Sequence, residues 1–251
     1  MSNLSFQLYS ARNFNPIGEV FALLSRVGLG HVEGYGGLYE DPKAMRGLLD
    51  AHGLAMSSGH FGLDQLRERK ATVEAARTIG ITDIFCPAIP NDQWKQDENA
   101  FNALADELAD LGRFYKQEGF GFGWHNHHFE FWPAESGRLP MDIILERAPE
   151  IDWEMDVAWV VRGGNDPLEW IERYGNRITA AHVKDLAPEG ENADEDGWAD
   201  VGHGTMDWKA IMAALDQHSR VKHLVLEHDN PADLERFARR SVDGVRAAME
   251  G

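Results

Sequence analysis

Short apolar runs alternate with amphipathic segments along nearly the whole chain. The apolar runs predict eight buried strands, at residues 5–9, 31–34, 54–58, 83–86, 121–125, 152–156, 179–182 and 223–227. Between them apolar residues recur at steps of three and four, as at Leu104, Leu108 and Leu111, which is typical of helices with one buried face. The pattern predicts helices at residues 16–27, 42–51, 63–78, 98–117, 141–147, 167–174, 207–216 and 232–249.

Strands that alternate with helices indicate a parallel sheet covered by helices. The count of eight strands favours a closed barrel over an open doubly wound sheet, and no G-x-G-x-x-G motif follows the first strand. A length of 251 residues is close to the size of one such barrel, and no Pro/Ser-rich linker divides the chain. We therefore expect an α/β protein with one (β/α)8 TIM-barrel domain over residues 1–251.

Composition narrows the class of protein. Hydrophobic residues make up 43% of the chain, which fits a globular domain, and no apolar run reaches the ~20 residues that a membrane span needs. The single cysteine, Cys86, lies in the apolar segment IFCPAIP and is expected to be a reduced core thiol. The first residues lack a basic start followed by an apolar stretch, so we expect no signal peptide, no membrane partner and a cytoplasmic location.

The charge is strongly acidic: 42 acids against 24 bases give a formal net charge of −18. Such a surface repels phosphate backbones, so we expect no nucleic-acid partner. Solubility explains most of this charge, and a weak attraction for divalent cations is its other consequence.

Polar residues gather where the predicted strands end, which is where (β/α)8 enzymes place their active sites. The segments that carry them are SSGH after the third strand, WHNHHFEF at the fifth, EMD at the sixth, HVKD at the seventh and LEHD at the eighth. The last four strands offer one candidate metal ligand each, and these are Glu130, Asp156, His182 and Glu227.

Neighbouring strands lie about 4.8 Å apart, so side chains on four consecutive strand ends can converge on one ion. Three carboxylates and one imidazole suit Mn²⁺, Mg²⁺ or Co²⁺ and can also bind Zn²⁺. A single acid at a strand end is more often a hydrogen-bond partner of a loop. However, Asp156 and Glu227 each end an otherwise apolar strand, where a charge is costly unless it is paired or bound to a metal.

The order and spacing of SSGHFGL, WHNHHFEF, EMDVAWVVRGGNDP, HVKDL, VGHGTMDW and LVLEHD resemble the xylose isomerase-like, or sugar phosphate isomerase/epimerase, (β/α)8 family over nearly the whole chain. The resemblance implies a divalent metal, commonly manganese, held by Glu, Asp, His and Glu from strands five to eight. Carried over, these ligands are Glu130, Asp156, His182 and Glu227. Family members that are ketose epimerases have the strand-five Glu near the position of Trp124, so His125 and His127 are alternatives to Glu130.

The resemblance also implies removal of a proton from carbon next to a carbonyl, with a metal-stabilised enediolate. The expected activity is that of an isomerase or epimerase of a sugar or keto-sugar in carbohydrate metabolism, with Glu130 and Glu227 as the catalytic pair. A lyase, such as an inosose-type dehydratase or an enzyme that eliminates from a 3-keto-glycoside, is the alternative, with His125 and His127 as acid and base. A metal-binding subunit without catalysis is a third possibility.

Other polar and aromatic side chains are candidates for contacts with the substrate. Lys184 is a candidate for neutralising an oxyanion, or else a partner of Asp185. The expected substrate-binding residues are Glu33, His60, Trp124, Asn126 and His203. Few bases lie near the strand ends and there is no P-loop, so the substrate is expected to be an unphosphorylated sugar or polyol. Family members often form dimers or tetramers, and a homo-oligomer fits the resemblance.

Overall fold

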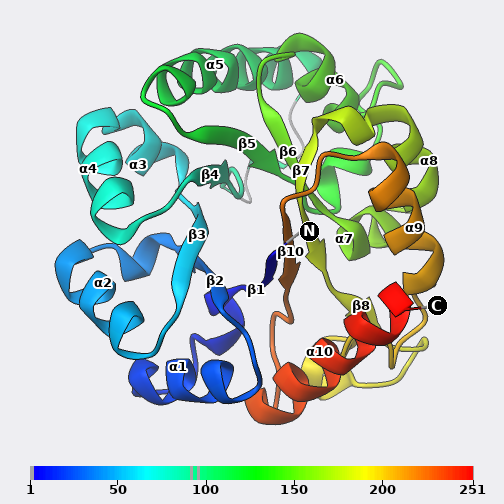
Figure 1. Ribbon diagram of the computed structural model, residues 1–251. Helices are drawn as coiled ribbons and strands as arrows, with labels where there is room; N and C mark the ends of the chain where they lie inside the picture. Colours follow the sequence, from blue (N-terminus) through cyan, green and yellow to red (C-terminus); the bar gives the residue numbers. More distant parts are fainter. Residues whose placement is uncertain (1–2, 91–92, 95–96, 251) are drawn as a thin grey trace.

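The computed structural model describes residues 3–90, 93–94 and 97–250, so residues 1–2 and 251 of the expected domain lie outside it. Eight parallel strands form a nearly closed barrel (Figure 1), in the order β1-β10-β7-β6-β5-β4-β3-β2. A single parallel bridge between Gln7 and Glu33 joins the two edges. The strands are β1 (Asn3–Phe6), β2 (His31–Tyr35), β3 (Ala55–His60), β4 (Asp83–Cys86), β5 (Gly121–His125), β6 (Asp152–Asp156), β7 (Ile178–Val183) and β10 (His223–Leu226).

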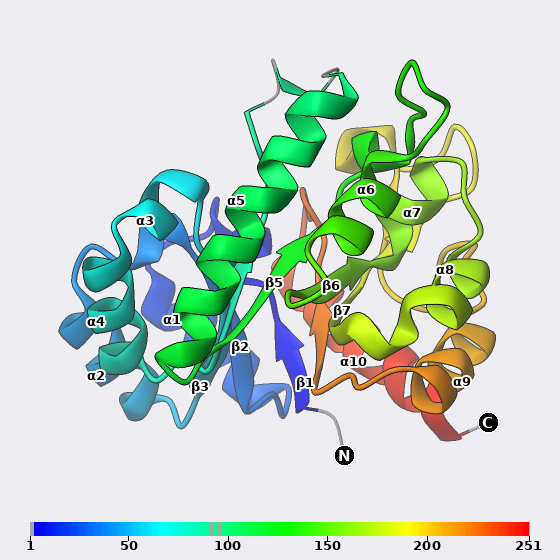
Figure 2. The same ribbon diagram turned by 90° about the horizontal axis from the view of Figure 1, so that it is seen from above.

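Helices surround the barrel, as the view from above also shows (Figure 2). They are α1 (Ile17–Arg26), α2 (Pro42–Ala51), α3 (Leu63–Arg67), α4 (Arg69–Ile79), α5 (Glu98–Gln117), α6 (Pro140–Arg147), α7 (Val157–Arg162), α8 (Pro167–Tyr174), α9 (Trp208–His218) and α10 (Leu234–Glu250). The expected TIM-barrel class is therefore confirmed. Within the described part of the chain, no helix is both long and apolar enough to cross a membrane.

Several helix starts follow directly from the sequence. The side chains of Asp41, Asp97 and Asp207 each accept a hydrogen bond from the backbone N–H three residues later, which caps α2, α5 and α9. Pro42 and Pro167 occupy the first turn of α2 and α8, where no backbone N–H is needed.

The structure departs from the predicted elements in four places. The predicted helix 63–78 is two helices, α3 and α4, because Glu68 leaves the helical conformation (φ −79°, ψ 52°). The first strand ends at Phe6, and the 3-10 helix η1 (Leu8–Ala11) follows it. The additional helix α7 begins directly after β6, and β8 (Asp185–Leu186) pairs antiparallel with β9 (Trp198–Ala199) in the loop after β7.

Residues two apart along a strand point to the same face of the sheet. The pairs Glu33 and Tyr35 in β2 and Glu154 and Asp156 in β6 therefore direct their side chains into the barrel at successive depths. This layering gives the barrel interior a mouth at the carboxyl ends of its strands and a deeper polar layer beneath it.

Candidate active site

A cavity of about 420 Å³ opens at the carboxyl ends of the strands. Its walls come from the ends of β2, β3 and β5 and from the segments that follow β1, β4, β6 and β10. The lining residues are Tyr9, Tyr35, Gly36, His60, Gly62, Gln65, Pro87, Ala88, His125, His127, Trp159, Glu227 and Asp229. The expected location of the site is thus a real hollow rather than a filled barrel end.

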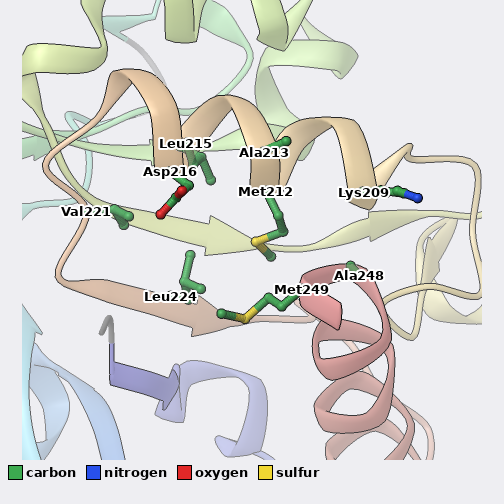
Figure 3. A pocket seen from close by; sticks show the side chains of 9 residues that line it. All are labelled: Lys209, Met212, Ala213, Leu215, Asp216, Val221, Leu224, Ala248 and Met249. Carbon is green, nitrogen blue, oxygen red and sulfur yellow. The ribbon is translucent and has the colours of Figure 1, made fainter. Parts of the chain in front are cut away.

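A second hollow of about 390 Å³ lies on the outside of the barrel, against α9, α10 and β10 (Figure 3). Its lining is mainly apolar, with Met212, Leu215 and Leu224 among its residues. Lys209 and Asp216 are the charged residues of this lining, and no imidazole takes part in it. The chemistry therefore belongs to the cavity at the strand ends.

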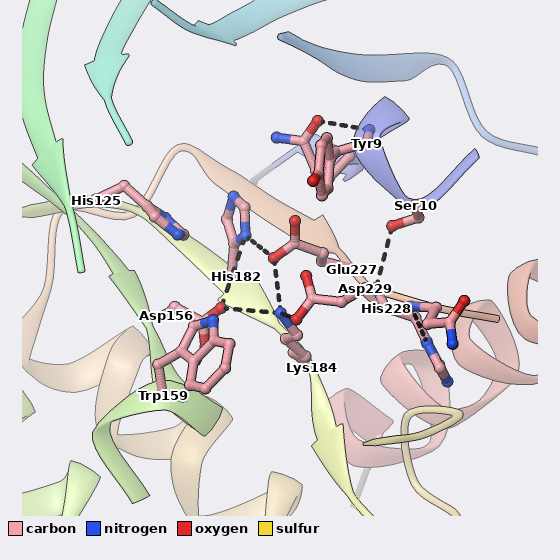
Figure 4. Close-up of polar contacts among 12 residues, drawn as sticks. Tyr9, Ser10, His125, Asp156, Trp159, His182, Lys184, Glu227, His228 and Asp229 are labelled. Carbon is pink, nitrogen blue, oxygen red and sulfur yellow. Dashed lines mark hydrogen bonds and ion pairs between the residues drawn. The ribbon is translucent and has the colours of Figure 1, made fainter. Parts of the chain in front are cut away.

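Four side chains converge at the floor of the cavity: His125, Asp156, His182 and Glu227 (Figure 4). Each offers one ligand atom, and these atoms all lie within 4.8 Å of one another. His125 and Asp156 end neighbouring strands, and Asp156 pairs in register with His182. All four are buried, so the group is shielded from bulk water.

Local structure fixes the orientation of Asp156. Its Oδ1 accepts a hydrogen bond from the backbone N–H of Trp159 at 2.9 Å and so caps α7. Its own N–H donates to Asn126 Oδ1 at 2.9 Å, and Asn126 Nδ2 donates to the Asp156 carbonyl at 3.1 Å. The remaining oxygen, Oδ2, is buried without a hydrogen-bond partner and lies 4.0 Å from His182 Nδ1. An orphaned carboxylate oxygen beside an imidazole is what an open metal position offers, so these residues fit a divalent ion.

Lys184 neutralises part of this acidic group. Its Nζ lies 2.6 Å from Asp229 Oδ2, 3.2 Å from Glu227 Oε2 and 3.8 Å from Asp156 Oδ2. Burial favours the neutral form of each carboxyl group. It raises the pKa of Asp156 to about 7 against the opposing effect of Lys184. For Glu227 burial acts in the same direction, but Lys184 and His182 outweigh it and hold the pKa well below its usual range.

The imidazoles at the cavity divide into neutral and charged forms. Burial, with His182 nearby, lowers the pKa of His125 to about 3, and burial with His125 nearby lowers the pKa of His127 well below its ordinary value. His182 differs, because Glu227, Glu154 and Glu33 overcome the effect of burial and raise its pKa well above the ordinary value. His125 and His127 are therefore neutral at neutral pH.

A second polar layer lies beneath the first. His60, His125, Glu154 and His182 form another buried group whose ligand atoms lie within 4.8 Å of one another. Glu154 Oε2 lies 2.5 Å from His60 Nε2 and 3.2 Å from His125 Nδ1. Because His125 and His182 belong to both groups, the two layers form one continuous network.

The structure brings together three of the four predicted metal ligands, Asp156, His182 and Glu227. It does not bring Glu130 to them. Glu130 lies in the 3-10 helix η4 (Phe129–Phe131), where its Oε1 accepts from Trp124 Nε1 at 3.0 Å and its Oε2 from the backbone N–H of His127 at 2.9 Å. His125 takes the fourth place in the group, which was the alternative left open by the sequence.

This geometry also corrects the prediction of Glu130 as a catalytic residue, because its carboxyl group does not line the cavity. Burial raises the pKa of Glu130 to about 8. The hydrogen bonds from Trp124 and from the His127 backbone hold this carboxyl group within the barrel wall, where it connects β5 to the turn that follows.

Four of the five predicted substrate contacts lie elsewhere. Glu33 and Trp124 are completely buried and do not line the cavity. Asn126 is also buried and connects β5 to β6 through Trp153 and Asp156. His203 is exposed and lines a different hollow beside Asp200, Arg236 and Arg240. Of these five residues, His60 alone lines the cavity.

Lys184 does not line the cavity either, so the prediction that it neutralises a substrate oxyanion is wrong. Its ammonium group instead balances the negative charge of Asp229, Glu227 and Asp156. The alternative pair with Asp185 does not form. Asp185 instead accepts hydrogen bonds from the backbone N–H groups of Leu186, Gly202, Gly204 and Met206 and from Trp208 Nε1. It organises the loop that contains the VGHGTMDW segment.

Sequence reasoning missed Tyr9, Tyr35 and Asp229 as cavity residues and Glu154 as a member of the deeper layer. A signal for Glu154 was present, because it lies two residues from the predicted ligand Asp156 on the same face of β6. Asp229 lies in the LEHD segment at the end of the eighth predicted strand, beyond the strand itself. Tyr9 ends the predicted strand 5–9, but in the structure it reaches the cavity from η1, which follows the end of β1.

Fold and site together define a (β/α)8 barrel with a buried His/Asp/Glu cluster, at the floor of a cavity, that could hold a metal ion. Residues 21–249 match the family described as xylose isomerase-like TIM barrel, and the chain belongs to that family.

Among curated proteins, an inosose dehydratase of Clostridium perfringens (strain ATCC 13124) is 23% identical over an alignment of 155 positions, and the match covers 52% of this chain and 48% of that protein. The chain thus spans about half the length of the curated relatives that it matches.

Solved structures share the fold. A sugar phosphate isomerase/epimerase from Parabacteroides distasonis has a TM-score of 0.80 at 21% identity, and the match covers 98% of this chain and 94% of that one. A structure of the IolI protein with a bound zinc atom has a TM-score of 0.75 at 14% identity and covers 98% of this chain and 96% of that one. At these identities the likeness shows the fold alone.

Proposed function

We propose that this protein is a divalent-metal-dependent lyase that removes a proton next to a carbonyl group of an unphosphorylated, polyhydroxylated substrate and expels water. The observation that carries the proposal is the convergence of His125, Asp156, His182 and Glu227 at the floor of a cavity of substrate size. The names of the curated relatives, inosose dehydratases, support the same reaction class.

Those four side chains would hold the metal. Two imidazoles and two carboxylates suit Mn²⁺, Co²⁺ or Zn²⁺, and the zinc atom of the IolI structure supports a divalent ion in this fold. This set has one carboxylate fewer and one imidazole more than the predicted set. It therefore suits Zn²⁺ better than the predicted set does, and it suits Mg²⁺ less well. A bound ion supplies Lewis acidity that stabilises negative charge on a substrate oxygen.

His127 is suited to accept the proton. Its ring lines the cavity, and burial keeps it neutral at physiological pH, so one ring nitrogen carries no proton. Tyr35 lines the cavity from the end of β2, and burial raises the pKa of its hydroxyl, which therefore stays protonated. The C–H bond breaks with its proton passing to His127, a C=C bond forms, and the C–O bond breaks as Tyr35 donates a proton to the departing hydroxyl, which leaves as water. Solvent then returns the proton from His127 to Tyr35.

The cavity favours an uncharged substrate. Among the described residues that line it there is no lysine or arginine, so a phosphate group would meet neither of these basic side chains there. Tyr9, Tyr35 and Trp159 offer aromatic faces, which suit the apolar face of a sugar or polyol ring. We propose a small polyol or keto-sugar as the partner, with no nucleic acid and no membrane.

An isomerase or epimerase is the second candidate. The observation that favours it is that the Glu227 carboxylate lines the same cavity as His127, so two groups that can carry a proton face the substrate. Against it, Glu130 is turned away, so the expected pair of Glu130 and Glu227 does not face the substrate together.

Product analysis separates these reactions. Metal-loaded protein is incubated with an inosose in heavy water, and the products are analysed by mass spectrometry and NMR. A lyase yields a product lighter by one water, whereas an isomerase yields a product of unchanged elemental composition that carries solvent deuterium. If metal-loaded protein neither exchanges a proton nor converts any keto-polyol or keto-sugar, the enzymatic proposal is wrong and the non-catalytic subunit is favoured.

A further inference from the structure

The two nitrogens of the His182 imidazole face different layers of the barrel. Nδ1 lies 2.8 Å from Glu227 Oε2 and 4.0 Å from Asp156 Oδ2, on the side of the proposed metal position. Nε2 lies 2.7 Å from Glu33 Oε1, on the side of the deeper layer. His182 therefore faces the proposed metal position through Nδ1 and the Glu33 carboxylate through Nε2.

We infer that Glu33 is a positioning residue, which holds the His182 ring so that Nδ1 is directed at the metal position. This inference rests on the metal site of the proposed function. A carboxylate that accepts the second N–H of a metal-bound imidazole fixes its tautomer and orientation and raises its basicity. Loss of such a partner typically weakens metal binding by about 10–100-fold.

The surroundings of Glu33 fit a positioning role, because the side chain does not line the cavity in which a substrate would bind. Glu33 is completely buried beneath the cavity floor. Gln7 Nε2 donates to Glu33 Oε1 at 2.9 Å, while Gln7 Oε1 accepts from the backbone N–H of Tyr9 at 3.0 Å. The bond to Tyr9 fixes which end of the Gln7 amide faces Glu33. Gln7 and Glu33 also form the backbone bridge that closes the barrel, so the hydrogen bond between their side chains is part of the barrel wall.

The deeper group is better explained as a support than as a separate ion site. It shares His125 and His182 with the upper group. Its carboxylate Glu154 already lies 2.5 Å from His60 Nε2 and 3.5 Å from His182 Nε2. An ion bound through His182 Nδ1 leaves Nε2 to these carboxylates, and one ion per chain is the expected stoichiometry.

Zn²⁺ titration by calorimetry at one fixed pH tests the inference. The chelator-treated wild type, Glu33→Gln and the control Asp83→Asn are compared. Asp83 is a matched control because its carboxylate contacts an imidazole, His223 Nε2 at 3.1 Å, at the opposite end of the same barrel. We expect Glu33→Gln to bind one ion about 10–100-fold more weakly than the wild type, and Asp83→Asn to bind with wild-type affinity.

Other outcomes overturn the inference in distinguishable ways. Unchanged affinity in a folded Glu33→Gln variant contradicts the positioning role alone. Two ions per chain in the wild type show that the deeper group is itself an ion site and not a support. If the wild type binds no ion, the inference and the metal site of the proposed function both fail. If Glu33→Gln does not fold, Gln7→Met removes the hydrogen bond that holds Glu33. Wild-type affinity for Zn²⁺ in that variant counts against the inference.

Discussion

The Glu130 carboxylate faces the indole of Trp124 rather than the imidazole of His182. The short 3-10 turn after β5 reverses the chain and directs Glu130 back against the barrel wall. His125, the last residue of β5, points into the barrel and takes the place that an acid was expected to fill.

Replacement of Glu130 by glutamine should therefore leave the metal content unchanged. The variant loses one carboxylate oxygen that accepts from Trp124 or from the His127 backbone, so its free energy of unfolding should fall by about 1–3 kcal/mol. Elemental analysis and urea denaturation measure the two effects. A variant that folds with wild-type stability but contains no metal would restore Glu130 as a ligand.

His127→Asn should reduce turnover by about 10²–10⁴-fold with little change in metal affinity, because His127 is the proposed proton acceptor. The adjacent His128 is the control, since its ring packs against Trp159 and Trp132 and does not line the cavity. Steady-state kinetics on the substrate found by product analysis provide the measurement. Equal losses in His127→Asn and His128→Asn would rule out a specific role for His127.

Asp185→Asn should destabilise the loop after β7. Its carboxylate accepts from four backbone N–H groups and one indole, and an amide offers only one accepting oxygen in its place. Each unsatisfied buried donor costs roughly 1–3 kcal/mol, so we expect a loss of several kcal/mol in urea denaturation. Asp194→Asn, at an exposed position of the same loop, should cost almost nothing. Equal stability of the two variants would contradict this role of Asp185.

The pH dependence of stability should report on Asp83, at the opposite end of the barrel. Burial alone would raise its pKa, but His223 and Lys222 outweigh that effect and lower it from 3.8 to about 2. A lowered carboxyl pKa stabilises the folded state above pH 3.8, and this stabilisation is lost as the pH falls through about 2. Its size is about 2 kcal/mol.

Urea denaturation of metal-free protein between pH 2 and 7 tests this expectation. The difference in free energy of unfolding between the wild type and Asp83→Asn should be largest above pH 4 and should shrink as the pH falls toward 2. A difference that stays constant over this range would show that the Asp83 charge contributes nothing.

Asp156, His182 and Glu227 could be predicted as neighbours from the sequence because each lies at the end of an apolar strand. The carboxyl ends of parallel strands meet at one edge of the barrel, so their order along the chain gives their order in space. The same reasoning predicted the eight barrel strands within a few residues.

Glu33, Glu130 and His203 could not be placed in this way, for different physical reasons. Glu33 points into the barrel, but strand periodicity does not say at what depth a side chain lies. Glu130 and His203 lie in loops whose path depends on contacts distant in sequence, such as the bonds between Asp185 and the Gly202–Gly204 segment. The pattern of apolar and polar residues within one segment does not predict contacts with segments distant in the sequence.

The metal content of Asp156→Asn tests the proposed site most directly. Asparagine keeps the oxygen that caps α7 but loses the charge at Oδ2, so the variant should fold while its ion is lost. Asp152→Asn, at the other end of the same strand β6, is the matched control. Elemental analysis should find one divalent ion per chain in the wild type and in Asp152→Asn, and none in Asp156→Asn. One ion per chain in folded Asp156→Asn would contradict the site.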